Sequence, residues 1–255
     1  MSTLGVVILN LSGMKHLARC LESVRWADAV TILHLGDGEP VLDQAPALAQ
    51  RMHIQRIVSL KDAKGPSSNL QTDWILHLWG DEEVGAELKG ELCALGCSEG
   101  GRVPSSYRIP IRSFLLGCWV EGSLWGPSPS PRLWSAAHDL ACGWWGIRER
   151  VSEEPSGSLR GWIRDHSSTE LRDGLDRVNR LSDLWVEQWR TRDQVPSFGA
   201  LALRPLRVFM RVLLRNGFFS AGLAGLTLSA LAAYAALLSG AKLWEAGNVR
   251  SEKTA

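Results

Sequence analysis

The stretch Trp74–Val84, WILHLWGDEEV, contains the change of pattern that predicts the fold. It opens with an apolar run of strand length, Gly80 then allows a turn, and three acidic residues follow at once. An apolar run of this kind is typical of a buried strand in a parallel sheet. Carboxylates directly behind a strand end are the oxygen ligands that divalent cations prefer. Trp79 stands where a second aspartate would serve such a site.

Strands and helices alternate on both sides of this stretch. Leu17, Leu21 and Val24 lie at helical intervals within residues 15–28, and Glu83–Leu95 predicts a second helix, ended by Gly96. Three further apolar runs predict strands: Val6–Leu9, Val30–Leu35 and Ile54–Leu60. The alternation predicts an α/β fold, with a mostly parallel sheet flanked by helices and ligands at the carboxyl ends of its strands.

The middle of the chain, residues 98–154, is rich in Gly, Pro and Trp. Within it, GPSPSPRLW (residues 126–134) carries three prolines, which disfavour both a helix and a central strand. This segment is either a linker or a loop over a site. We favour the loop because Trp119, Trp125 and Trp134 lie in or beside it.

The C-terminal part predicts helices. Ser167 with Glu170 resembles a capping box, and apolar residues follow it at helical intervals. Farther on, four arginines share one helix face: Arg204, Arg207, Arg211 and Arg215. A basic amphipathic helix suits an anionic membrane surface. Residues 216–241 then carry no charge and exceed the roughly 20 residues of a bilayer span. A full crossing, a monotopic helix and a buried helical pair in a soluble domain all fit this pattern.

The composition of the 255 residues is that of a globular protein, with 45% hydrophobic and 22% charged residues. The net charge of +1 gives no general attraction to nucleic acid, and none is expected as a partner. Five cysteines without a C-x-x-C pair favour a reducing compartment. The first residues lack a basic leader and a signal-length apolar run, so we expect them in the cytoplasm.

Several blocks resemble family 2 glycosyltransferases, in the branch that contains bacterial lipopolysaccharide-core glucosyltransferases. The resemblance runs from about Gly5 to Glu245. The blocks are LARCLESVRWAD, TDWILHL, YRIPIRSFLLGCWV, PRLW and the Arg-, Gly- and Ala-rich tail of residues 203–245. It implies a GT-A-like domain over residues 1–165, a helical connection over 166–198, a membrane-associated region over 199–245 and a polar tail over 246–255. It also implies transfer of a hexose from a nucleotide-diphosphate sugar, with a divalent metal, Mn²⁺ or Mg²⁺.

The same resemblance supplies candidate site residues. The family's metal-binding Asp-x-Asp corresponds to Trp79-Gly80-Asp81, so Asp81 is the candidate metal or diphosphate contact. Its alternative is an acidic residue placed at a helix N-terminus by the helix dipole. Glu149 matches the glutamate of the family's His-Glu motif and is the candidate base, against a solvated surface glutamate. Four residues are candidate substrate contacts: Asp37, His34, Arg132 and Trp79.

Other positions depart from the family or leave alternatives open. Ser12 and Gly13 stand where the family has Asn-Glu, and His34 stands where it has an aspartate. Arg132 could bind a phosphate through both guanidinium arms, or could instead hold its loop through backbone carbonyls. His166 lies near a family histidine and is a weak metal candidate.

Two functions follow from this pattern. The first is a glycosyltransferase acting on a lipid-linked or envelope glycan, at the cytoplasmic face of a bacterial inner membrane, peripheral or single-span. The second is a catalytically inactive homologue that serves as a membrane-bound scaffold or regulatory partner. The resemblance over nearly the whole chain, together with Asp81 and Glu149, motivates the first function. The second is motivated by the nucleotide-binding, metal and base motifs, which are all altered while the packing segments are intact. We lean towards the first.

Overall fold

A computed structural model describes residues 2–11, 15–36, 52–57, 70–95, 104–115, 117–122, 129–136, 156–190, 198–215 and 222–252. The chain divides into two compact units. The first unit comprises residues 1–112 and 126–167, and the second comprises residues 113–125 and 168–255. The segment 113–125 thus belongs with the C-terminal residues, a grouping that the sequence pattern did not predict.

The first unit is built on a sheet whose described strands number seven, in the order β10-β6-β9-β4-β1-β2-β3. Four of them are parallel neighbours: β1 (Leu4–Leu11), β2 (Ala29–Leu35), β3 (Met52–Ile57) and β4 (Trp74–Trp79). The others are β6 (Ser106–Ile109), β9 (Ser130–Ser135) and β10 (Ser156–Ser158). β9 runs antiparallel to β4 and β6, whereas β10 is parallel to β6. The predicted α/β class with a mostly parallel sheet is confirmed.

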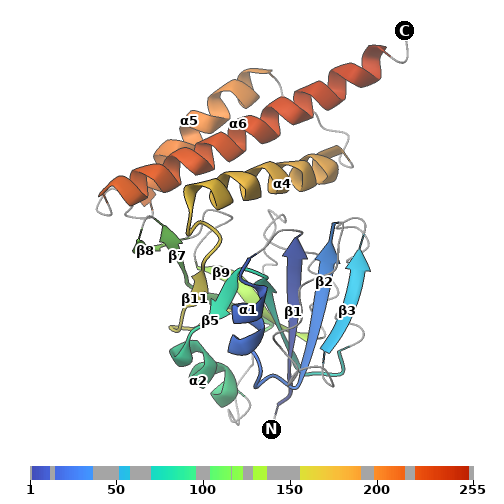
Figure 1. The fold of residues 1–255 in the computed structure, drawn as a ribbon, viewed down its shortest axis with the longest axis vertical. Helices are drawn as coiled ribbons and strands as arrows, with labels where there is room; N and C mark the ends of the chain where they lie inside the picture. The colour runs from blue at the N-terminus through green and yellow to red at the C-terminus, as the bar shows by residue number, and fades with distance from the viewer. Residues whose placement is uncertain are drawn as a thin grey trace. The chain divides into compact units, whose positions relative to one another are not determined.

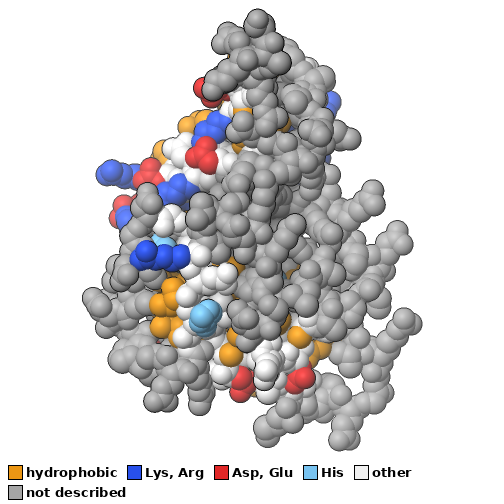
Figure 2. All heavy atoms as spheres, turned by 90° about the vertical axis from the view of Figure 1, so that its right-hand side faces the viewer, with side chains coloured by type: hydrophobic (Ala, Val, Ile, Leu, Met, Phe, Trp, Pro, Cys, Tyr) orange, Lys and Arg blue, Asp and Glu red, His pale blue; other side chains and the backbone are white. Residues whose placement is uncertain are grey.

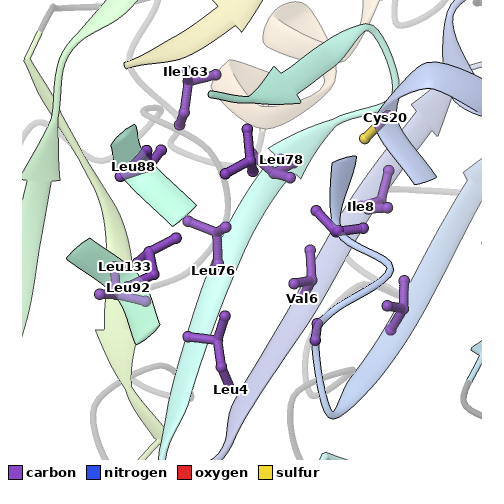
Figure 3. Packing of buried hydrophobic residues seen from close by; sticks show 14 of the residues in the cluster. Leu4, Val6, Ile8, Cys20, Leu76, Leu78, Leu88, Leu92, Leu133 and Ile163 are labelled. Carbon is purple, nitrogen blue, oxygen red and sulfur yellow. The ribbon is translucent and has the colours of Figure 1, made fainter. Parts of the chain in front are cut away.

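Two short helices pack on one face of this sheet, α1 (Leu17–Ser23) and α2 (Ala86–Ala94). In Figure 3, Val6 and Ile8 of β1 lie beside Leu76 and Leu78 of β4, with Leu88 of α2 close by. Every residue of β1 is buried, which is why the strand reads as a continuous apolar run. Full burial of a leucine or isoleucine side chain stabilises by about 1.5–3 kcal/mol, so this cluster holds the unit together.

The predicted helix Glu83–Leu95 is wrong at its beginning. Residues Glu82–Val84 form strand β5, which pairs antiparallel with β11 (Ile163–Asp165) in a second sheet. The order of that sheet is β5-β11-β7-β8, with β7 at Ile111–Leu115 and β8 at Cys118–Glu121. The helix starts only after Gly85, because pairing with a strand some 80 residues away outweighs the local helical pattern.

The expectation that residues 126–134 exclude a central strand is also wrong. β9 lies inside the seven-stranded sheet, between β6 and β4. Pro131 is tolerated there for two reasons. β4 pairs with β9 only over residues 133–135, and the register with β6 shifts beside Pro131, leaving Arg132 as the extra residue of a β-bulge. A bulge is one of the few places where a strand accepts proline.

The second unit contains three long helices: α4 (Leu171–Arg190), α5 (Phe198–Arg215) and α6 (Gly222–Glu252). α6 packs against both α4 and α5 (Figure 1). α4 begins at Leu171 rather than directly after Ser167, so the predicted capping box is not at its first turn. In the upper part of Figure 2, Lys and Arg side chains lie beside Asp and Glu side chains.

α6 is long and apolar enough to cross a membrane over Gly222–Ala246, judged by length and composition alone. Half of its most apolar window is buried inside the structure. The same length and composition also occur in core helices of soluble proteins, so the helix allows membrane association and no more.

Candidate functional site

The carboxyl ends of the parallel strands place polar side chains side by side. The sheet register aligns Asn10 of β1 with His34 of β2 and Arg56 of β3. The Asn10 Nδ2 atom lies 2.9 Å from the His34 Nδ1 atom, and both side chains are buried. Since the amide nitrogen donates, Nδ1 accepts and the ring proton sits on Nε2. His34 therefore lies at the predicted sheet edge, while a substrate contact through it stays a prediction.

Asp81 occupies the turn that follows β4, and two backbone hydrogen bonds and one bond to its side chain hold it there. The Gly80 amide donates to the Leu9 carbonyl at 2.9 Å, and the His166 amide donates to the Asp81 carbonyl at 3.0 Å. The Asp81 Oδ1 atom accepts from the His16 amide at 3.4 Å. Asp81 is 5% exposed, so it does not point into bulk solvent.

The contact between His16 and Asp81 bears on the helix-dipole interpretation of this carboxylate. His16 is the N-cap residue of α1, so Asp81 lies at a helix N-terminus, where a negative charge is favoured. That helix is α1 and not the helix that follows Asp81 in sequence, which begins five residues later behind β5. The favourable helix dipole that the sequence suggested for Asp81 thus comes from α1 and not from the helix that follows it.

His166 lies next to Asp81 and is held by two charged partners. Its Nε2 atom is 3.0 Å from Glu83 Oε2, and its Nδ1 atom is 3.1 Å from Arg19 Nη1. A guanidinium can only donate, so Nδ1 accepts and Nε2–H donates to Glu83. The ring centroid of His16 lies 5.7 Å from that of His166. A carboxylate-oriented imidazole is suited to proton transfer, but Nδ1 can take a proton only after Arg19 moves away.

Arg132 forms a buried ion pair with Glu82. Arg132 Nη2 lies 2.7 Å from Glu82 Oε1, and Nη1 lies 3.2 Å from Oε2. The guanidinium also donates to Ser130 Oγ at 3.2 Å and to the His77 carbonyl at 3.5 Å. The Ser130 acceptor is a hydroxyl and the His77 carbonyl belongs to β4, so the alternative in which Arg132 holds its loop through backbone carbonyls stays a prediction. A phosphate contact through Arg132 stays a prediction.

Trp79 is buried at the end of β4 and is enclosed by the same acidic stretch. Its amide donates to Glu82 Oε2 at 2.8 Å, and its carbonyl lies 3.5 Å from the Cys20 Sγ atom. Burial, together with the charges of Glu82, Asp81 and Glu83, raises the pKa of the Cys20 thiol well above its usual value. Cys20 is therefore a protonated packing residue and not a nucleophile at neutral pH.

The remaining predicted residues cannot be placed. Asp37 and Glu149 lie outside the described part of the chain, and so do Ser12 and Gly13. Among the described residues, no three His, Cys, Asp or Glu side chains are grouped so that they could hold a metal ion. The described residues therefore do not form a metal site by themselves, and a metal contact through Asp81 or His166 stays a prediction.

Sequence reasoning missed the groups that surround Asp81. Arg19 and His16 come from α1, and Glu83 comes from β5, a strand that the sequence pattern assigned to a helix. Nothing in the local pattern distinguishes Arg19 from the other charges of its helix. Glu82 and Glu83 did stand in the acidic stretch, but their partners lie 50 and 83 residues away.

Models of known protein families give no match to the chain. Among solved structures, TarS of S. aureus is 12% identical over 87% of this chain and 46% of its own, with a TM-score of 0.46. This chain thus spans about half the length of TarS. A putative glucose-1-phosphate thymidylyltransferase from Bacillus anthracis, solved in complex with a sucrose, is 12% identical over 70% of this chain and 95% of its own, with a TM-score of 0.42. Likenesses at these scores do not assign an activity.

Proposed function

We propose that this chain transfers a hexose from a nucleotide-diphosphate sugar to a lipid-linked or cell-envelope glycan, with inversion at the anomeric carbon. One observation carries the proposal. Asn10 and His34 on neighbouring parallel strands, and Asp81 behind a third, bring polar groups to the carboxyl edge of one sheet. Ligands of open parallel sheets bind at this edge. The resemblance to family 2 glycosyltransferases supplies the identity of the ligand.

The proposed reaction is a single displacement. The acceptor hydroxyl oxygen forms a bond to the anomeric carbon while the bond from that carbon to the diphosphate oxygen breaks. The electron pair leaves with the nucleoside diphosphate, whose growing negative charge needs stabilisation. A carboxylate takes the hydroxyl proton, and Glu149 is the proposed base. Four residues are the proposed donor contacts: Asp37, His34, Arg132 and Trp79.

A divalent cation, Mn²⁺ or Mg²⁺, is part of the proposal as a cofactor of donor binding. Mg²⁺ is commonly held by one or two carboxylates together with substrate phosphates, so Asp81 could contribute a ligand without a larger protein cluster. The described residues do not form a site for the cation by themselves.

We also propose attachment to the cytoplasmic face of a bacterial inner membrane, either peripheral or through a single span. The uncharged stretch of α6 and the arginines of α5 support attachment.

Thermal unfolding in the presence of nucleoside diphosphates and nucleotide sugars tests the donor site. A ligand at 100 times its Kd stabilises the folded state by about 2.7 kcal/mol, which corresponds to a rise of about 5–10 °C in Tm. The titration is run with Mn²⁺, with Mg²⁺ and with a chelator. Asp81→Asn should remove the metal-dependent part of the rise.

Asp176→Asn is the matched control, because Asp176 is an exposed aspartate of α4. It should leave the nucleotide-induced rise unchanged. No rise with any nucleotide would refute the donor site. A metal-dependent rise that survives in Asp81→Asn would place the metal elsewhere.

A second candidate function is an inactive homologue that acts as a scaffold or regulatory partner. The observation that favours it is Trp79, which is 5% exposed at the position that resembles the first metal aspartate. Incubation of the full chain with nucleotide sugars and Mn²⁺ separates the two candidates when nucleotide binding is present. Release of nucleoside diphosphate on adding an acceptor extract supports turnover, whereas binding without any release supports the scaffold.

A further inference from the structure

α5 exposes a row of large apolar side chains beside a row of arginines. Leu203, Leu206, Met210 and Leu214 are spaced by three or four residues, so they share one face of the helix. All four are exposed, and Leu206 and Leu214 are more than 60% exposed. On the neighbouring face, Arg207 and Arg211 are exposed as well. α5 contains four arginines and no acidic residue.

α6 exposes a second row, in which no residue carries a charge. Its members are spaced by three or four residues and lie along one face of the helix. They are Leu223, Leu226, Ala230, Tyr234, Leu237, Ala241 and Trp244. A row from residue 223 to residue 244 is about 32 Å long at the rise of an α-helix. We call the two rows together the α5–α6 face.

The hydroxyl groups of α6 do not make this helix more polar. Thr227, Ser229 and Ser239 each donate to the carbonyl four residues earlier, at 2.6–2.8 Å. Because these three hydroxyls are bonded within the helix, contact with an apolar phase leaves none of their protons without an acceptor.

The packing of α6 against α4 opposes a crossing of the bilayer. Lys242 of α6 donates to the Asn179 carbonyl, to Ser182 Oγ and to the Asp183 carboxylate, all on α4. α4 carries eight charged residues in its twenty. Placing such residues at the centre of a bilayer costs about 2.5–3.5 kcal/mol each. α6 can therefore span only by leaving α4, which would expose residues of its apolar window that are now buried.

We propose that the α5–α6 face docks onto an anionic lipid bilayer, with both helices lying in the plane of the membrane surface. The apolar rows enter the boundary between headgroups and acyl chains, while Arg207 and Arg211 meet the lipid phosphates. Tyr234 and Trp244 are aromatic residues of the type that favours this boundary. A second copy of the chain fits less well, since a two-fold contact would bring arginine-bearing helices together. The inference rests on the proposed membrane attachment and not on sugar transfer.

Co-sedimentation of the full chain with vesicles, without any nucleotide, tests whether an anionic bilayer is what the α5–α6 face binds. Vesicles of phosphatidylcholine with phosphatidylglycerol should bind the chain, and vesicles of phosphatidylcholine alone should bind it much less. Each arginine near an anionic surface contributes about 1 kcal/mol, so R207A/R211A should weaken binding about 30-fold. R172A/R180A, which removes two exposed arginines of α4, is the matched control and should bind as the parent does.

Single substitutions test each row of the face. Leu206→Glu on α5 and Leu237→Glu on α6 should each weaken vesicle binding at least tenfold. Leu175→Glu, at an exposed leucine of α4, should not. Circular dichroism must show the same helix content in all variants. Equal binding to both kinds of vesicle would overturn the proposal. Weaker binding from only one of the two substitutions, Leu206→Glu or Leu237→Glu, would overturn it as well.

Depth measurements separate an in-plane helix from a spanning one. Ala230 and Ala241 are both exposed on the α6 row and are about 16 Å apart along the helix axis. Each is replaced by Cys in a chain whose own cysteines are Ser, and is labelled with a fluorophore that spin-labelled lipids quench. Equal shallow depths support the in-plane helix. Depths that differ by about 16 Å would show a crossing and overturn the inference, while membrane attachment itself would stand.

Discussion

The buried pair of Arg132 and Glu82 allows a quantitative test of what this arginine does. The side chain of Glu82 is fully buried and that of Arg132 is 9% exposed. Replacing Glu82 by Ala leaves the guanidinium buried without its carboxylate and removes the acceptor of the Trp79 amide. Breaking a buried, hydrogen-bonded ion pair from one side costs about 3–5 kcal/mol. We therefore expect Glu82→Ala to lower the free energy of unfolding by about that amount.

The chain contains a natural control for this experiment. Arg25 and Glu22 form a pair of similar length, 2.9 Å, but the two side chains are 66% and 68% exposed. Such an exposed i,i+3 pair at the end of a helix contributes about a few tenths of a kcal/mol, so Glu22→Ala should change stability little. The two pairs have the same charged groups, so the difference between the variants reports burial together with the Trp79 amide bond that Glu82 also accepts.

Urea unfolding followed by tryptophan fluorescence measures both variants, and the transition of the first unit is the relevant one. A double variant, Glu82→Leu with Arg132→Met, should cost at least 2 kcal/mol less than the sum of the single variants, since neither charge is then left unpaired. A cost below about 1 kcal/mol for Glu82→Ala would refute the reasoning. Arg132 would then find another partner, and a phosphate contact would become its better interpretation.

Three further predictions follow from burial and close contact. Because the pKa of Cys20 is raised in the folded chain, its contribution to stability is complete below about pH 9 and declines as the pH rises beyond that value. Cys20→Ala should flatten this alkaline decline, and Tm values from about pH 7 to about pH 10.5 measure it. Gly161→Ala should destabilise by several kcal/mol or prevent folding, because a Cβ atom there would lie 2.3 Å from the Leu88 backbone. Urea unfolding measures this loss. Gly90→Ala, inside α2 with no atom within 4 Å of the added Cβ, should instead stabilise by about 0.5–1 kcal/mol in the same assay.

Three of the four neighbouring parallel strands, β1, β2 and β4, could be predicted because their signal is local. A strand buried on both faces must be apolar at nearly every position, and the runs around Val6, Ile32 and Leu76 meet that condition without reference to any partner. The arginine row of α5 and the uncharged stretch of α6 were visible for the same reason, since helical spacing depends only on neighbouring residues.

Other features depend on pairings between distant residues, which no local pattern encodes. β5 is a strand because Ile163–Asp165 lies beside it, and Pro131 sits in a central strand because a bulge relieves the missing amide. The site depends on the same pairings. The family resemblance identified Asp81 and suggested His166, but only the β5–β11 pair and the position of α1 bring them together with Glu83 and Arg19.

The sequence by itself therefore determined which segments are apolar and where charge is absent, since these are properties of single residues and their near neighbours. The tertiary structure alone decided which carboxylate pairs with which arginine or histidine side chain. A buried charge is stable only beside a partner, and here the partners lie 50 residues apart for Glu82 and 83 for Glu83. The same physical condition turned Arg132 inward to Glu82 and left Arg207 and Arg211 exposed on α5.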